Sequence, residues 1–394
     1  MRRVVLPFAP VVMVALAVIA GCSSARPAAS SSTAAAGSTS GPEIAISVSA
    51  CGTGWSPARP GPVRFVLHDT DTRAGSADLI DASSGAVYAE VEPIGPGTTT
   101  TLDADLGSGR YAFRCAMEDE PAVTGPVVTL AGNVKGDTPA VLPVSQGDLI
   151  DATKAYQGYV RRSLPGLLVA TTRLASDVRS GDLAAARRDW LPAHLDYLML
   201  GAAYSAFGDF DGEIDGRADG LPLGVRDPSW TGLHRLEYGL WQGQTAAVLL
   251  PVATGLESAV ATLQREWPTI QIDPLDISIR AHEITEDALR FALTGRDDYG
   301  SHSGLASTRT DLDATRTVLG FVRPLLAPRY SGYPTLMAWL DRTQHDLDAL
   351  KHGGTFPALS SLSQLAREKV NSDVSELAEL LAPVASILEP RRTS

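Results

Sequence analysis

The chain has 394 residues, and 45 acidic against 33 basic side chains give a net charge of −12. A single hydrophobic core stops growing at about 250–300 residues, so this length predicts more than one domain. Apolar residues make up 44% of the chain, which is enough to build ordinary cores. The negative charge argues against nucleic acid as a partner and is compatible with a cationic ligand.

The N-terminus has the pattern of a bacterial lipoprotein signal. Two arginines precede an apolar run at residues 4–20, and Ile19-Ala20-Gly21-Cys22 follows the lipobox pattern of small residues before a cysteine. The run is too short, and lacks the flank, for a membrane-spanning helix. We expect a signal peptide at residues 1–21, lipidation of Cys22, and a flexible tether at 22–41 that is rich in Ser, Ala and Thr. The mature protein is then exported and lipid-anchored to the outer face of the cell membrane.

The next segment, residues 42–132, is predicted to be a small β-sandwich. Short stretches of alternating apolar and polar residues are separated by turns rich in glycine and proline. This spacing is typical of two packed sheets. The predicted strands are 43–48, 63–68, 110–115 and 127–130.

After a linker at 133–145, the periodicity becomes helical and remains so over residues 146–388. We expect a bundle of two packed four-helix units, because many helices are joined by short connections. The acidic segment 209–227 is predicted to be mainly a solvated turn, with Asp215 its best candidate to point inward. The predicted helices are 147–180, 182–208, one around residue 234, 245–265, 275–294, 303–326, 334–351 and 359–386.

One stretch of the helical region has the chemistry of a metal half-site. His234 and Glu237 are three residues apart on one predicted helix and therefore share a face. Leu233, Leu236 and Leu240 supply an apolar stripe that packs this helix into a core. Imidazole and carboxylate on one face suit a divalent or trivalent ion, and iron or zinc better than copper(I). A surface His–Glu pair is the alternative interpretation.

Other side chains are candidates to complete the site. His194 lies on a predicted helix that precedes the acidic segment of Asp215, and His282 and Glu286 are i,i+4 neighbours on a later helix. The His282 segment lacks the second histidine of the zinc-peptidase His-Glu-x-x-His pattern. For His194 and His282 the alternative is a hydrogen-bonded core residue.

Cys51 and Cys115 lie in the β region. In an oxidising compartment such a pair is expected to form a disulfide, and the alternative is a sulfur–carboxylate metal site. A blue-copper site needs two histidines, and only His68 accompanies Cys115 and Met117 in this region.

The motif Gly232-x-His234-x-x-Glu237, followed by Tyr238-Gly239-Leu240-Trp241, resembles the Gly-x-His-x-x-Glu motif of imelysin-type proteins. The preceding β-sandwich resembles the cupredoxin-like domain of the EfeO subgroup, whose members are exported iron-uptake components. The resemblance covers roughly residues 42–385. It implies a partnership with a membrane permease and a haem peroxidase.

The resemblance also implies site residues. His234 and Glu237 become metal ligands, and Asp215 matches an aspartate near the first acidic loop. In the β domain, the two cysteines match those of the family, Glu90 and Glu92 match its acidic pair, and Asp78 stands where a glutamate is usual. The family places two further glutamates at positions that are Leu198 and Gly201 here, so His194, His282 or Glu286 would have to substitute.

The sequence therefore predicts a non-enzymatic metal-binding lipoprotein that delivers iron to a permease, with zinc or copper as other possible metals. A metallopeptidase is the first alternative. It requires a general base beside the metal, for which Glu283 or Glu286 is the candidate. A metal-free binding scaffold is the second alternative.

Overall fold

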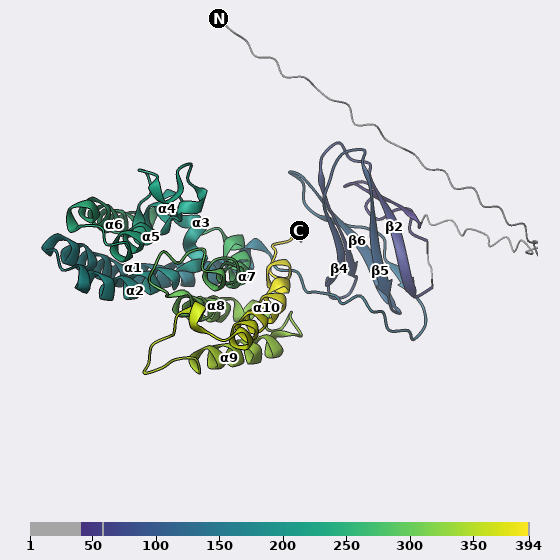
Figure 1. The fold of residues 1–394 in the computed structure, drawn as a ribbon. Helices are drawn as coiled ribbons and strands as arrows, with labels where there is room; N and C mark the ends of the chain where they lie inside the picture. Colours follow the sequence, from purple (N-terminus) through teal and green to yellow (C-terminus); the bar gives the residue numbers. More distant parts are fainter. Residues whose placement is uncertain (1–40, 57–58, 393–394) are drawn as a thin grey trace, which may run out of the picture. The chain divides into compact units, whose positions relative to one another are not determined.

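The computed structural model describes residues 41–56 and 59–392. The predicted signal peptide at 1–21, the lipidation site Cys22 and all but the last residue of the predicted tether lie outside these residues. Within the described part, a β-sheet region spans residues 43–130 and helices follow from residue 146 onward (Figure 1). The predicted order of a β region followed by a helical region is confirmed.

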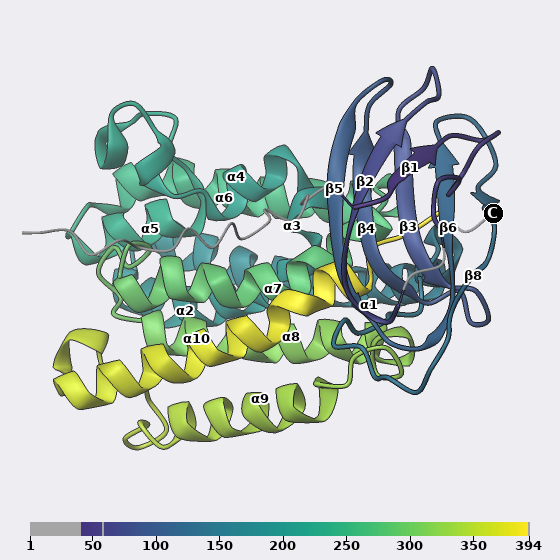
Figure 2. The same ribbon diagram turned by 90° about the vertical axis from the view of Figure 1, so that its right-hand side faces the viewer.

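The β region consists of two sheets (Figure 2). One has the order β1-β2-β5, and the other has the order β4-β3-β6-β7 with β8 also paired to β6. Phe65 and Phe113 contact edge to face in the apolar core between them. The strands are β1 (Glu43–Ile46), β2 (Gly61–Asp69), β3 (Gly75–Asp81), β4 (Val87–Ile94), β5 (Thr99–Leu106), β6 (Gly109–Met117), β7 (Val123–Thr124) and β8 (Val128–Leu130).

Cys51 and Cys115 form a disulfide, which is the first of the two interpretations of this pair. The acidic residues of the region have a different neighbour, because the strand register places Asp78 between Glu90 on β4 and Arg114 on β6. Arg114 Nε donates to Asp78 Oδ2 at 3.1 Å. A guanidinium therefore occupies the place beside Asp78 that a cation would take. In the described part of the chain, Glu90 and Glu92 join no cysteine in a metal-binding cluster.

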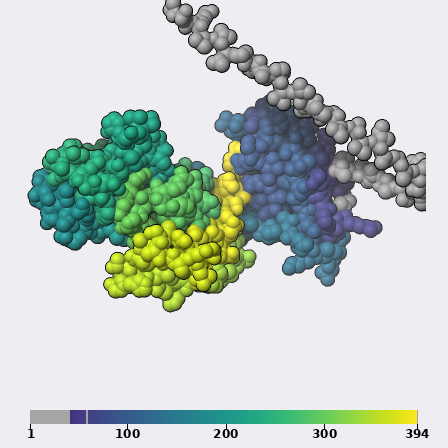
Figure 3. Space-filling model, in the orientation of Figure 1, coloured from purple at the N-terminus to yellow at the C-terminus, as the bar shows by residue number. Residues whose placement is uncertain are grey.

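The helical region contains two groups of four long helices. In the first group α1 packs on α2 and α6, and α5 packs on α6; in the second, α7 packs on α8 and α10, and α9 packs on α8 and α10. Figure 3 shows the first group in teal and the second in green to yellow. The long helices are α1 (Gln146–Ser180), α2 (Leu183–Leu198), α5 (Gly232–Trp241), α6 (Ala246–Glu266), α7 (Pro274–Arg290), α8 (Gly304–Leu326), α9 (Tyr333–Asp348) and α10 (Gln364–Ile387).

Two predicted elements differ from the structure. The predicted helix 182–208 is interrupted after α2 by the 3-10 turn η1 (Gly201–Ala203) and resumes as the short α3 (Tyr204–Phe207). Arg280 Nε donates to the Gly201 carbonyl at 2.9 Å, so α7 supplies a partner for the backbone at this break. The predicted turn at 209–227 begins instead with the helix α4 (Asp209–Asp215), which packs on α6.

Among the described residues, the segment Ala246–Thr269, which includes α6, is long and apolar enough to cross a membrane, with a mean hydropathy of 1.6. This helix contacts α1, α4 and α5. Its apolar residues therefore help to form the core of the first four-helix group.

Removing the disulfide is expected to destabilise the β region. The bond closes a segment with a sequence separation of 64, and the loss of a native disulfide typically costs about 2–5 kcal/mol. The variant Cys51→Ala/Cys115→Ala should therefore unfold at lower denaturant concentration than the wild type when unfolding of the β region is followed by the NMR signals of its strand amides. An unchanged midpoint would contradict a stabilising role for this bond.

Candidate metal centre

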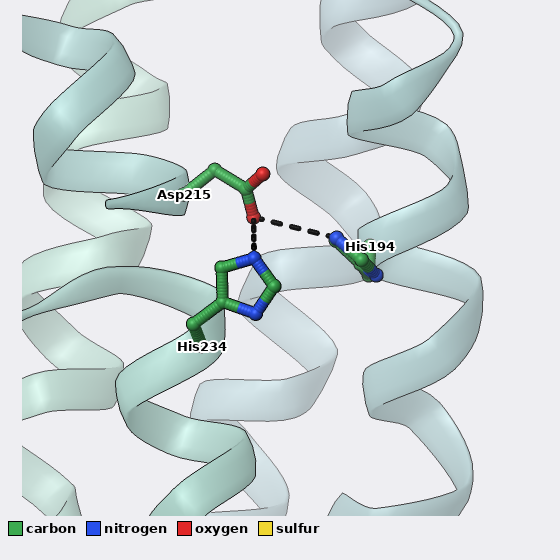
Figure 4. A group of neighbouring side chains, drawn as sticks. All are labelled: His194, Asp215 and His234. Atoms are coloured by element: carbon green, nitrogen blue, oxygen red, sulfur yellow. Dashed lines mark ion pairs between the residues drawn. The ribbon is translucent and has the colours of Figure 1, made fainter. Parts of the chain in front are cut away.

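Three side chains from three helices converge inside the helical region (Figure 4). His194 comes from α2, Asp215 from the end of α4, and His234 from the first turn of α5. Asp215 Oδ1 lies 3.5 Å from His194 Nε2 and 3.7 Å from His234 Nε2. The three ligand atoms all lie within 4.8 Å of one another. Metal–ligand bonds of about 2.0–2.2 Å separate neighbouring ligand atoms by about 3–4 Å, so one ion fits among these atoms.

The three side chains are shielded from water. His194 is 2% exposed, His234 3%, and the Asp215 side chain 14%. Within the described part of the chain, neither ring nitrogen of His194 nor Asp215 Oδ1 has a hydrogen-bond partner. Buried polar atoms nearly always have partners, because burying them without one costs free energy. An ion among these atoms would satisfy His194 Nε2 and Asp215 Oδ1 together.

Gly232 explains how Asp215 and His234 come together. Its φ angle is +85°, a left-handed conformation that side-chain-bearing residues rarely adopt. A Cβ at this position would lie 2.4 Å from the Ile214 carbonyl oxygen. Only glycine therefore lets the start of α5 approach the end of α4 closely enough to place the two ligands side by side.

Two tryptophans hold the same elements in place. Trp190 Nε1 on α2 donates to the Leu233 carbonyl on α5 at 2.8 Å, and Trp230 Nε1 donates to the Gly216 carbonyl after α4 at 2.8 Å. The Trp190 ring also lies 4.9 Å from that of His194. These contacts fix the relative positions of the three ligand-bearing helices.

Glu237 has a different position from the predicted one. Its side chain is fully buried, and Oε1 accepts hydrogen bonds from Tyr299 N, Ser301 N and Ser301 Oγ at 2.6–2.9 Å. Its other oxygen, Oε2, lies 3.4 Å from His234 Nδ1. A carboxylate can only accept, so this contact puts the proton of a neutral His234 on Nδ1 and leaves Nε2 free to bind a metal. Glu237 orients His234 instead of joining the cluster.

His282 and Glu286 are not brought to the centre. His282 Nε2 lies 3.7 Å from Glu286 Oε1, and the Glu286 side chain is 46% exposed. Neither residue lines the cavity that contains the three converging side chains. Leu198 and Gly201, at the positions where the resemblance called for glutamates, do line it. Of the predicted substitutes for these glutamates, the structure therefore places His194 at the centre.

The cavity has a volume of about 540 Å³ and extends from the centre toward α7 and α8. Besides Asp215, it is lined by four carboxyl groups that were not predicted as site residues: Asp211 on α4, Asp287 on α7, Asp297 in the segment before α8 and Asp311 on α8. The burial of Asp311 could have been predicted from its position on the helix, because its helical neighbours Thr308, Leu312 and Thr315 are all buried. An aspartate on the apolar face of a helix is rarely buried without a partner for its carboxyl group.

The charges in the cavity shift one another's ionisation. Burial opposes the ionised form of Asp215, but the imidazoles of His234 and His194 outweigh it and hold the pKa of Asp215 below its ordinary value. Burial also opposes protonation of His234, yet Asp215 and Glu237 raise its pKa to about 9. Burial, followed by the nearby Asp297, raises the pKa of Asp311 well above its ordinary value.

Two imidazoles and one carboxylate form a donor set that suits iron, zinc and other divalent transition metals. Three protein ligands leave coordination positions for water or another ligand. The contact between Glu237 and His234 is the usual support of a metal-binding histidine, in which a carboxylate accepts from the ring nitrogen that faces away from the metal. The arrangement has the chemistry of a centre for one transition-metal ion.

Glu237→Gln is expected to weaken metal binding without unfolding the protein. The amide oxygen still accepts from the 299–301 segment, so its NH₂ group faces His234 and makes Nδ1 the acceptor. The proton then moves to Nε2, where it competes with a metal. A loss of about 10–100-fold in affinity is typical for such a change. Nitrogen-15 NMR of the histidines above pH 9, where His234 is neutral, should report the tautomer switch, and a neutral wild-type ring that carries its proton on Nε2 would refute the assignment.

Comparison with known proteins agrees with this architecture. Three relatives, from Escherichia coli strain K12, Shigella flexneri and Escherichia coli O6:K15:H31, each carry the name "Iron uptake system component EfeO". Each is 25% identical over 338 residues, which cover 83% of this chain and 86% of the relative. The imelysin (peptidase M75) family model matches residues 152–384, more than half of the chain and nearly all of its helical region. The chain belongs to the imelysin family.

Proposed function

We propose that this protein is an exported, lipid-anchored component of an iron-uptake system, and that it binds iron at His194, Asp215 and His234. The observation that carries the proposal is the set of buried nitrogen and oxygen atoms that converge without hydrogen-bond partners among the described residues. The names of the relatives, which cover most of both chains, supply iron as the metal. The ion is then the cargo of the protein.

The remaining parts of the proposal rest on the N-terminus and on the resemblance. The lipobox ending in Cys22 supports export and anchoring at the outer face of the cell membrane. Anchoring keeps a cargo protein close to a membrane permease, the proposed recipient of the iron, with a haem peroxidase as a further component of the system. We also propose a cupredoxin-like fold for the β region.

A metallopeptidase remains the alternative within the imelysin family, and it requires a general base beside the metal. The two glutamates predicted for that role do not face the ion site. Glu283 forms an ion pair with Arg280 at 3.1 Å, and Glu286 lies outside the cavity. This arrangement favours binding and release of the ion over peptide hydrolysis, and digestion of a peptide library with and without chelator tests the alternative.

His234→Ala and Asp215→Asn should each lower iron affinity by at least about 100-fold, because each removes a direct ligand, and the loss of a supporting residue alone costs 10–100-fold. Equilibrium dialysis against ferrous iron under anaerobic conditions measures the effect. His282→Ala is the matched control, since it removes an imidazole from the same helical region but outside the cavity. Full iron binding by His234→Ala would end the proposal.

Metal binding should strengthen as the pH rises toward about 9. The pKa of His234 is raised to about 9, so the metal-free protein holds a proton there at neutral pH and must release it to bind an ion. Affinity should therefore increase about tenfold per pH unit between pH 7 and 8 and level off above pH 9. Titration with Co²⁺, followed by its visible absorption, measures the slope, and a flat profile over this range would contradict the assigned protonation.

In the metal-free protein the same group makes stability depend on pH. A folded-state pKa above the unfolded value of about 6.5 stabilises the fold fully below that value, and the stabilisation disappears as the pH rises through about 9. Metal binding should reverse this trend, because it favours the deprotonated imidazole.

A further inference from the structure

We propose that the cavity binds its ion together with a small oxyanion, a carboxylate or a phosphate, which arginines of the cavity hold against the open coordination positions of the metal. The inference rests on the proposed function, because it names the chemical form in which the cargo is bound. Two imidazoles and one carboxylate leave positions on iron open. At about 30 Å³ per water, an ion with six waters occupies roughly 200 Å³. The cavity of about 540 Å³ therefore has room for an anion beside the ion.

Three guanidinium groups lie around the ring of Phe291 and form an arginine cluster. The guanidinium carbon is 3.5 Å from the ring centroid in Arg217, 5.2 Å in Arg290 and 5.8 Å in Arg296. Arg217, Arg290 and Phe291 line the cavity. A guanidinium over an aromatic ring is held in place while its N–H groups can still donate, and its paired donors match the oxygens of a carboxylate or phosphate. The cluster therefore has the chemistry of an oxyanion site.

Asp219 compensates the charge of this arginine cluster only in part. Its Oδ1 lies 3.5 Å from Arg217 Nε and its Oδ2 lies 3.3 Å from Arg296 Nη2, so two guanidinium groups share one carboxylate. Arg217 Nε is buried and has no hydrogen-bond partner among the described residues. In the same part of the chain Arg290 forms no ion pair, since the aspartate one helical turn before it, Asp287, pairs with Arg280. Three guanidinium groups and one carboxylate leave two positive charges for an anion.

The other carboxyl groups of the cavity do not supply the missing negative charge in full. Asp287 pairs with Arg280 at 3.1 Å, and Asp211 accepts from a tyrosine hydroxyl at 2.5 Å. Burial raises the pKa of Asp211, Asp297 and Asp311, which favours their neutral forms. An anion that enters the cavity therefore finds donors in Arg217 and Arg290.

The arginine cluster adjoins the ion site. Arg217 follows the ligand Asp215 by two residues, which limits the separation of their Cα atoms to about 7 Å. Both side chains line the cavity, together with His194 and His234. An oxyanion can give one oxygen to the ion and accept from Arg217 with another. In a cavity shielded from water, the attraction of the anion to the metal and to the guanidinium is stronger than in bulk water.

Citrate and inorganic phosphate are the two probes, in separate experiments, because they distinguish a carboxylate from a phosphate as the anion. Equilibrium dialysis of the full chain with the labelled anion, with and without ferrous iron under anaerobic conditions, measures how much anion is retained. The wild type should retain about one anion per ion, and much less anion without iron. Arg217→Gln/Arg290→Gln should weaken anion binding in the presence of iron by at least about tenfold, because it removes charged hydrogen-bond donors.

The same variant should bind ferrous iron without the anion at least as tightly as the wild type does, because the guanidinium groups repel a cation. Damage to the fold would instead weaken the binding of both iron and anion. Arg342→Gln is the matched control, since its guanidinium also lies over an aromatic ring, 4.5 Å from the centroid of Trp339, but outside the cavity. It should leave both affinities unchanged. Arg290→Gln alone, at the exposed last residue of α7, serves if the double variant does not fold.

The outcomes separate this inference from the proposed function. If the wild type binds ferrous iron but retains neither anion, or if citrate removes the iron without being retained, the oxyanion subsite does not exist and the metal centre stands. Equal anion retention by the wild type and the double variant, or an equal loss in Arg342→Gln, would also overturn the inference. If the wild type binds no ferrous iron with or without an anion, the proposed function itself fails.

Discussion

The position of Asp215 between two buried imidazoles is the constraint on which the rest of the helical region depends. Its carboxylate oxygen lies within 3.7 Å of both Nε2 atoms, and the structure gives that oxygen no hydrogen-bond donor among the described residues. Burying the Asp215 carboxylate and the two imidazoles without partners costs free energy unless a cation interacts with all three groups. A proton shared with His234 does so in part, and a metal ion does so completely. The fold therefore keeps an unsatisfied site ready for a cation.

The positions of the ligands depend on contacts between residues that are far apart in the sequence, and these contacts involve backbone atoms. The close approach of Gly232 to the Ile214 carbonyl joins α5 to α4, and Trp190 joins α2 to α5 through the Leu233 carbonyl. Because both contacts involve backbone atoms, a side-chain substitution in the partner element leaves them in place. The ligand positions are therefore held by rigid elements, which favours a preorganised site over one assembled on binding.

Much of this could be predicted from the sequence. Periodicity and breakers identified the long helices, and the His234–Glu237 spacing identified one side of the centre, because both are local patterns. The role of Glu237 could not be predicted, since its hydrogen-bond donors are in residues 299–301. Asp297 was missed because the other residues that line its cavity are mostly distant from it in the sequence. Strands β3, β4, β5 and β7 were not predicted. In β3 the buried Asp78 interrupts the apolar pattern, and only the partner Arg114 makes that position tolerable.

Anomalous diffraction at the iron absorption edge, from crystals of the protein loaded with ferrous iron, tests the account most directly. The account predicts a strong anomalous peak between His194 Nε2, Asp215 and His234 Nε2, at about 2.0–2.2 Å from each ligand atom. Glu237 should remain behind His234 without touching the ion. A peak at a different place in the chain, or none near these three side chains, would contradict the central claim.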